Sequence, residues 1–242
     1  MDEFLALAET SLDPVGVELW RLYSLSLAED TSPQSLSILR AAVRPDFAIG
    51  RQEDSCEFWE ELSAHLPPSM QQCIAVRYQE YQTCSNCAHV TSDAWLTSFI
   101  VEMKRPTDWL KSHKFDSLTE WSQPSNLACP SCAQHCVTER RRYIFPDTLK
   151  YVALRLPALD GTGLRRNIKI TDLNTKKASI WGTRFELISA IIHYGLAGSG
   201  HYTVLNRKGA TWLHLDDSKD PVVRRRFIQN LENGYMLLFK RL

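Results

Sequence analysis

The sequence contains no hydrophobic run long enough to cross a membrane and no basic, apolar leader at its start. A transmembrane helix needs about 20 consecutive apolar residues, and the 242 residues contain no such stretch. The first nine residues, MDEFLALAE, carry acidic side chains where a secretory signal peptide carries positive charge. We therefore expect no membrane partner and an intracellular location, in the cytoplasm, the nucleus or both.

The sequence also lacks an excess of charge of either sign. It has 28 Lys and Arg residues against 28 Asp and Glu residues, so its formal net charge is zero. Proteins that coat a nucleic-acid duplex usually carry a basic excess on one face, which makes a nucleic-acid partner an unfavoured interpretation. Two short basic runs, at residues 140–142 and 224–226, are typical of solvated faces in a neutral protein.

The sequence shows no internal repeat and no low-complexity segment. Its hydrophobic residues make up 44% of the chain, which suffices for a substantial core. Its length is near the upper limit for one domain. These properties predict one large domain or a few closely packed subdomains.

Residues 1–66 carry a helical pattern. Pro14 and Pro33 suit the first turn of a helix, and apolar residues recur at helical spacing after each of them. A third helix is expected at residues 56–66, because Pro67 follows and cannot continue it. The first part of the chain is therefore predicted to be an all-helical lobe.

From residue 74 onward the hydrophobic period changes towards two. The segments are rich in β-branched and aromatic residues, and Gly and Asn turns separate short strands in the last third. A helical lobe followed by a series of strands predicts an α+β fold. The expected strands are residues 74–82, 96–103, 137–145, 151–156, 167–170, 184–193, 202–206, 211–215 and 235–240.

Four of the seven cysteines form two C-x-x-C pairs about forty residues apart, Cys84 with Cys87 and Cys129 with Cys132. Each turn directs two thiolates at one point. Two turns complete a tetrahedral shell of four sulfurs, which suits Zn²⁺ and leaves no open position for catalysis. We therefore predict a structural zinc site, with four free thiols as the alternative. Cys136 could replace Cys132 as a ligand, although this choice breaks the symmetry of the two turns.

A glycine-rich loop in the last third connects an apolar segment to a histidine. Residues 185–193 are mostly apolar, the loop contains Gly198 and Gly200, and His201 begins the next expected strand. Asp216 follows one hairpin later. A histidine whose neighbouring strand supplies a carboxylate can have its tautomer fixed and its imidazolium form stabilised. The pattern therefore favours a catalytic histidine.

This segment and four further blocks resemble the ubiquitin-specific protease (USP) family. Residues 198–202 read G-S-G-H-Y and residues 212–217 read W-L-H-L-D-D, which is similar to the histidine box of that family. The resemblance extends from about residue 17 to residue 242. The other blocks come in the order that the family requires: Q-E-D-S-C-E-F at 52–58, the two cysteine pairs, L-K-Y-V-A-L-R-L at 149–156 and Y-M-L-L-F-K-R at 235–241.

The resemblance implies a papain-like USP fold of the α+β class, in a single domain over residues 1–242. A helical, incomplete thumb would occupy residues 1–70, zinc-ribbon fingers residues 71–148 and an antiparallel palm sheet residues 149–242. In that family the three parts together grip ubiquitin. Ubiquitin or ubiquitinated proteins are therefore the partners that the resemblance implies.

The resemblance also implies roles for individual residues. His201 would be the general base, Asp216 would orient it, and Asp217 would support the oxyanion or the attacking water. The remaining candidates would hold the extended C-terminal tail of ubiquitin, whose arginines suit a carboxylate partner. These tail-binding candidates are Gln52, Asp54, Gly198, Gly200 and Tyr202.

The family's cysteine box, G-L-x-N-x-G-N-T-C-Y-x-N-S, does not occur in these residues. A thiol protease without its thiolate loses the acyl-enzyme route. Cys56 is a poor substitute, because it is expected in the middle of a helix, facing the thumb helix rather than the catalytic histidine. Two interpretations follow. The chain is a USP-type deubiquitinase domain, a thiol-dependent ubiquitin hydrolase by lineage, that recognises ubiquitin but is inactive as it stands. Alternatively, it is a ubiquitin-binding pseudoenzyme that acts as a scaffold. Whether the box is truncated or lost stays open.

Overall fold

The computed structural model describes the strands and helices of most of the chain after residue 32. The expected helix after Pro14 and the expected strand at residues 167–170 lie outside the described part. Within that part, no helix combines the length and the apolar character that a membrane crossing requires. The described residues are 33–47, 53–103, 121–156, 178–180, 182–196, 199–216, 219–224 and 233–242.

Among the described residues, three helices precede the first strand: α3 (Pro33–Val43), α4 (Ser55–Ala64) and α5 (Pro68–Gln71). Asp54 caps the N-terminus of α4, because its Oδ1 accepts a hydrogen bond of 2.8 Å from the backbone N–H of Cys56. The helix ends before Pro67, as the sequence predicts, and Pro68 then opens the short helix α5. The helical first lobe is therefore present in the described residues.

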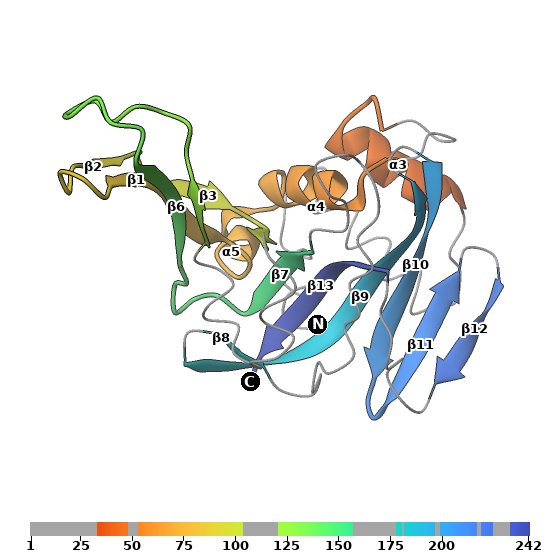
Figure 1. Cartoon of the computed structure of the whole chain (residues 1–242). Coiled ribbons are helices and arrows are strands. Elements are labelled where there is room, and N and C mark those ends of the chain that lie inside the picture. Colours follow the sequence, from red (N-terminus) through yellow and green to blue (C-terminus); the bar gives the residue numbers. More distant parts are fainter. Residues whose placement is uncertain are drawn as a thin grey trace.

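A five-stranded sheet, which we call the fingers, has the strand order β2-β1-β6-β5, with β3 also paired to β1. The two long strands β1 and β6 run antiparallel from the pair Arg77–Ile144 to the pair Cys84–Val137. Figure 1 shows this sheet extending away from the helices. Its strands are β1 (Val76–Cys84), β2 (Val90–Ser92), β3 (Leu96–Ser98), β5 (Trp121–Pro124) and β6 (Val137–Ile144).

A second sheet, which we call the palm, has eight strands in the order β12-β11-β10-β9-β13-β7-β4, with β8 paired to β9. Its described pairs are antiparallel except for β4 with β7, which are parallel. Its strands are β4 (Val101–Glu102), β7 (Tyr151–Arg155), β8 (Ala178–Ile180), β9 (Thr183–Leu196), β10 (Ser199–Lys208), β11 (Thr211–Asp216), β12 (Lys219–Arg224) and β13 (Gly234–Arg241).

The single strand expected at residues 96–103 is wrong, because the structure divides it between the two sheets. The segment forms β3 in the fingers and β4 in the palm. Between them, the Ser98 hydroxyl donates to the carbonyl of Ile100 at 2.7 Å and lies 3.2 Å from the Ile100 N–H. A serine that bonds to nearby backbone groups offers an alternative to the strand ladder, so the chain changes sheet here.

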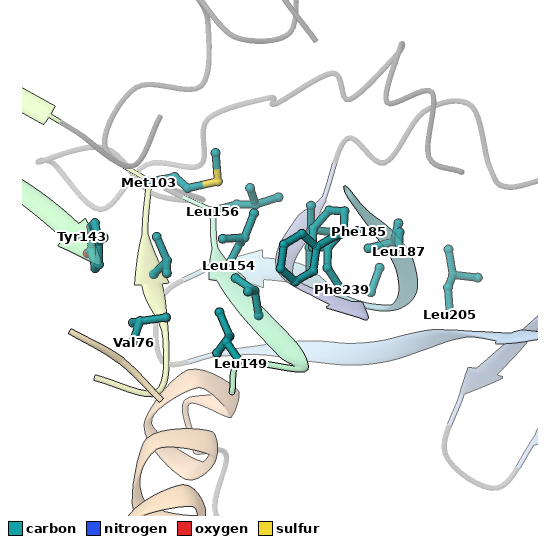
Figure 2. Packing of buried hydrophobic residues seen from close by; sticks show 14 of the residues in the cluster. Val76, Met103, Tyr143, Leu149, Leu154, Leu156, Phe185, Leu187, Leu205 and Phe239 are labelled. Carbon is teal, nitrogen blue, oxygen red and sulfur yellow. The ribbon is translucent and has the colours of Figure 1, made fainter. Parts of the chain in front are cut away.

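The palm sheet buries apolar side chains on both faces. On β9, Phe185 and Leu187 belong to the largest core cluster, whereas Ile188 packs on the cluster that includes Leu39 of α3 and Met70 of α5. Because successive side chains of a strand point to opposite faces, one face of the sheet faces the helices and the other faces the main core. Figure 2 shows Phe185, Leu187 and Phe239 of that main core lying together. The predicted α+β class is confirmed.

Candidate functional site

The hairpin of β9 and β10 places His201 at the end of the palm sheet. Gly195 and Gly200 lie opposite each other in the hairpin, and His201 lies opposite Tyr194. A Cβ atom added at Gly200 would overlap Nε2 of His193 and the carbonyl oxygen of Tyr194. Only glycine therefore lets the two strands approach this closely, and the close approach fixes the backbone directly before His201.

His201 and Asp216 form a direct pair across neighbouring strands. The His201 Nε2 atom lies 2.5 Å from Asp216 Oδ1, with 43% of the histidine side chain and 19% of the aspartate side chain exposed. The other oxygen, Oδ2, accepts a hydrogen bond of 2.6 Å from Lys219 Nζ. These bonds hold the pKa of Asp216 below its usual value, with the bond from Lys219 as the larger cause and the bond from His201 second.

This arrangement is suited to proton transfer. An anionic carboxylate at Nε2 stabilises the neutral tautomer that carries its proton on that nitrogen. Nδ1 of His201 is then the nitrogen that can take up a proton. With nearly half of its side chain exposed, His201 is accessible to a reacting group.

Asp54 lies at the junction between α4 and the palm sheet. Its Oδ2 accepts hydrogen bonds from the Tyr235 hydroxyl at 2.6 Å and from Arg155 at 3.1 Å, while Oδ1 caps the helix. Burial, and then the bond to Asp54, raise the pKa of Tyr235 well above its usual value. Both oxygens of Asp54 therefore already have protein partners, and the carboxylate ties the helix to β7 and β13.

Tyr202 belongs to an aromatic cluster beside Asp54. Its ring centroid lies 4.5 Å from that of His193 and 5.8 Å from that of Tyr235. His193 is buried, and it is the residue opposite Tyr202 in the hairpin. Because side chains alternate along β10, Tyr202 and His201 point to opposite faces of the strand. The cluster packs against Cys56 of α4.

The structure describes five of the eight predicted catalytic and tail-binding residues, and Gln52, Gly198 and Asp217 lie outside the described residues. It also reveals three polar groups that the sequence analysis did not assign: Lys219 on Asp216, and Arg155 and Tyr235 on Asp54. Lys219 is close enough to Asp216 in the sequence for a hairpin to join them, so this contact could have been predicted. The two partners of Asp54 are 101 and 181 residues away, and the sequence gives no indication of these contacts.

The four cysteines of the two C-x-x-C pairs meet at the tip of the fingers. Their sulfur atoms all lie within 4.8 Å of one another. The Sγ atoms of Cys84 and Cys132 are 3.6 Å apart, and those of Cys87 and Cys129 are 3.7 Å apart. A tetrahedral Zn²⁺ site with Zn–S bonds of about 2.3 Å requires sulfur separations of about 3.8 Å, so the described geometry suits this metal.

The two cysteine turns have the same backbone conformation. The N–H of Ala88 donates to the carbonyl of Cys84 at 3.0 Å, and the N–H of Ala133 donates to that of Cys129 at 2.8 Å. Both alanines have positive φ angles, 55° and 58°, which a non-glycine residue adopts at a cost of about 1 kcal/mol. Two separate turns with the same strained conformation indicate a shared constraint, and the donor set fits a metal held by both.

Cys136 is close to this cluster but not equivalent to its members. Its Sγ atom lies 3.3 Å from that of Cys84, yet it does not belong to the group of four mutually close sulfurs. Its carbonyl accepts a hydrogen bond of 3.1 Å from the N–H of Ser85 instead of closing a third turn. The symmetric set of Cys84, Cys87, Cys129 and Cys132 is therefore the better set of metal ligands.

The two remaining cysteines are buried. Cys56 is 1% exposed, and its burial raises the pKa of the thiol far above its usual value. Cys73 is 7% exposed, and its thiol donates to the carbonyl of Ser69 at 3.4 Å. A thiol of this kind is inert because the thiolate is the nucleophilic form.

Two comparisons with known proteins bear on this site. Residues 15–239 match the family model of the ubiquitin carboxyl-terminal hydrolases. The solved structure of the SAGA DUB module Ubp8/Sgf11/Sus1/Sgf73, bound to monoubiquitin, contains a chain with a similar fold, with a TM-score of 0.62 and 14% sequence identity. The alignment covers 96% of the present chain and 60% of that chain, so the present chain spans about three fifths of its length.

Proposed function

Because the chain belongs to the ubiquitin carboxyl-terminal hydrolase family, we propose that it recognises ubiquitin through a USP-type thumb, fingers and palm. Its fold is similar to a chain in a module that is bound to monoubiquitin, which supports this choice of partner. The observation that carries the proposal is the pair His201–Asp216, which lies at the glycine hairpin where the family resemblance expects it.

In the proposed site, His201 is the general base and Asp216 orients it. The distance of 2.5 Å between Nε2 and Oδ1 and the exposure of the imidazole support these two roles. Lys219 is a positioning residue, since it holds the second carboxylate oxygen from the next strand. Asp217 would support the oxyanion or the attacking water, a role that rests on the family resemblance.

The ubiquitin tail would bind between α4 and the β9–β10 hairpin. Gln52, Gly198, Gly200 and Tyr202 would border the ubiquitin tail there. Asp54 would contribute its negative charge to the arginines of the tail, although its oxygens are already bonded to Tyr235, Arg155 and the helix. Its first function is therefore to hold the thumb against the palm, and its effect on the tail would be electrostatic.

We further propose that these 242 residues do not hydrolyse ubiquitin conjugates on their own. Each of the seven cysteines lies in the described part of the chain, and none suits a nucleophile. Five gather at the finger tip, while Cys56 and Cys73 are buried. This observation favours the second candidate, a ubiquitin-binding pseudoenzyme that acts as a scaffold, over a self-sufficient hydrolase.

A structural zinc ion would complete the fingers. Cys84, Cys87, Cys129 and Cys132 would hold it, and it would tie the turn after β1 to the turn before β6. With four sulfur ligands the ion has no open coordination position, so its contribution is to folding.

Titration of isotope-labelled ubiquitin with the purified chain tests ubiquitin recognition. We expect saturable shifts, and we expect the affinity to fall about tenfold, equivalent to about 1.4 kcal/mol, when the C-terminal tail of ubiquitin is removed. Tyr202→Ala should weaken binding, whereas Lys208→Ala, an exposed change at the far end of β10, should not. No shifts at millimolar concentration would leave only a scaffold role without ubiquitin.

A ubiquitin probe with an electrophilic C-terminus tests the inactivity. We expect no covalent adduct with the chain, because the probe reacts only with an accessible thiolate. An adduct that disappears on Cys56→Ala but persists on Cys73→Ala would contradict this expectation and identify Cys56 as the nucleophile.

A further inference from the structure

The two faces of the finger sheet carry opposite charge patterns. The run Arg140–Arg142 lies on β6, where successive side chains alternate between the faces. Arg140 and Arg142 are exposed on one face, and Arg141 is partly buried on the other. We call the face that carries Arg140 and Arg142 the outer finger face. It is defined by Arg77, Tyr81, Trp95, Arg140 and Arg142. The cross-strand pairs Gln79–Arg142 and Tyr81–Arg140 place β1 residues on the same face.

The opposite, inner face is turned towards the palm and satisfies its charges internally. Tyr143 is buried in the main core, and its hydroxyl accepts a hydrogen bond of 3.2 Å from the backbone N–H of Glu102 in the palm strand β4. Arg141 pairs with Glu80 at 2.5 Å and with Glu102 at 3.2 Å. Because the inner face packs towards the palm, the outer face points away from it.

The arginines of the outer face have no such carboxylate partners. Among the described residues, no carboxylate oxygen lies within 4.0 Å of Arg77, Arg140 or Arg142. Arg142 instead donates to the neutral side chain of Gln79, with the shorter bond at 2.6 Å. Three exposed guanidinium groups on neighbouring strands repel one another, so this face gains free energy when an anionic group binds to it.

Aromatic rings hold two of these arginines in place. The guanidinium carbon of Arg142 lies 5.1 Å from the ring centre of Trp95 and 5.5 Å from that of Tyr81. The guanidinium carbon of Arg77 lies 5.6 Å from the ring centre of Trp95. Stacked guanidinium groups lose less conformational entropy on binding than mobile ones do. The outer face is therefore ordered for recognition rather than only solvated.

We infer that the outer finger face binds an acidic, extended segment of a partner protein. Arg140 and Arg142 are two residues apart on one strand, a spacing of about 6.6 Å that also separates alternate side chains of an extended peptide. A segment with carboxylates at alternate positions can place one opposite each arginine. This inference does not depend on ubiquitin recognition.

A peptide fits this surface better than a nucleic acid does. Nucleic acids also bind arginines interleaved with aromatic rings, but their affinity comes mainly from long-range attraction to a net basic surface. This chain has 28 basic and 28 acidic residues, and the inner face places Glu80 and Glu139 on the same two strands. A short acidic peptide needs only ion pairs with the arginines of this face. Its binding therefore does not require a net positive charge on the chain.

The test uses the whole chain and a fluorescein-labelled peptide of nine residues in which Glu alternates with Thr. Anisotropy titration should give saturable binding that weakens about tenfold for R140E/R142E, since each exposed pair contributes a factor of about two to five. Trp95→Leu should weaken binding about threefold, because it removes the stacking but keeps the charges. The matched control R184E/K208E makes the same charge change at two exposed palm positions and should leave the affinity within twofold.

Three results would overturn the inference. The first is equal loss of affinity in R140E/R142E and R184E/K208E, because that would show a response to net charge alone. The second is equal binding of a peptide with Gln in place of Glu. The third is tighter binding of an oligothymidine than of the acidic peptide, which would assign the face to a nucleic acid. Thermal unfolding of each variant separates these results from misfolding.

Discussion

Lys219 Nζ lies 2.6 Å from Oδ2 of Asp216, while the other oxygen of that carboxylate faces His201. The backbone holds this contact in place, because Asp216 and Lys219 are partners in the register of β11 and β12. One oxygen of the carboxylate thus contacts an imidazole on one neighbouring strand, and the other oxygen contacts an ammonium group on the strand at the other side. Lys219 is the larger cause of the lowered pKa of Asp216.

Lys219→Met should make the free energy of unfolding less sensitive to a fall in pH. A carboxyl whose pKa is lowered by folding stabilises the protein above its unfolded pKa of about 3.9, and this contribution is lost as pH falls through the lower, folded pKa. Without Lys219 the folded pKa of Asp216 rises towards its usual value. The variant should therefore be less stable than the wild type at pH 7 and should lose less stability on acidification. Urea unfolding across a pH series measures both effects.

The control for this prediction is Lys208→Met, which removes an exposed lysine from the end of the same palm sheet. It should leave the pH profile of stability unchanged. If Lys219→Met and the wild type lose the same stability between neutral and acidic pH, the contact with Asp216 contributes nothing in solution.

The finger cysteines should bind about one zinc ion per chain. Cys129→Ser should abolish the metal and lower the unfolding temperature, because the thiolate shell supplies folding free energy to the finger tip. Cys136→Ser is the matched control and should retain the metal, since Cys136 lies outside the group of four mutually close sulfurs. Metal analysis by mass spectrometry with a thermal melt measures both variants. Loss of zinc in Cys136→Ser together with its retention in Cys132→Ser would show that Cys136, and not Cys132, is the fourth ligand.

Gly200→Ala should destabilise the chain by about 3 kcal/mol, because the added methyl group overlaps the His193 ring and a backbone oxygen that cannot move alone. Gly209→Ala is the control. Gly209 has a positive φ of 61° but no atom within 4 Å of an added Cβ, so only backbone strain of about 1 kcal/mol is expected. Equal destabilisation in urea unfolding would show that strain, rather than the close approach of the strands, explains Gly200.

The sequence predicted much of the fold because local pattern and tertiary structure agree in it. The strands expected at residues 137–145 and 235–240 are present as β6 (Val137–Ile144) and β13 (Gly234–Arg241), and the apolar segment before the glycine loop is β9. The two cysteine pairs met because β1 and β6 align along their whole length. The similarity to the ubiquitin carboxyl-terminal hydrolases was also predicted and is confirmed by the family match.

Other features depend on packing between distant elements and have no local signature. The split of residues 96–103 arises because Val101 and Glu102 find a parallel partner in β7. The partners of Asp54 lie on β7 and β13, far away in the sequence, so its role as a link between the thumb and the palm could not be predicted. The functional assignments of His201 and Asp216 stay predictions, although the structure brings the two side chains together.

The link between Asp54 and Tyr235 should contribute about 2 kcal/mol to stability, the usual net value of a hydrogen bond to a charged group. Tyr235→Phe removes the hydroxyl donor. Asp54→Asn keeps an oxygen that caps α4, because asparagine is as good an N-cap as aspartate, but it removes the charge that Tyr235 and Arg155 share. Urea unfolding of both single variants and the double variant gives a coupling energy that is insensitive to helix capping. A coupling energy near zero would mean that this hydrogen bond does not help to hold the helices against the palm sheet, and that the apolar contacts between them do so instead.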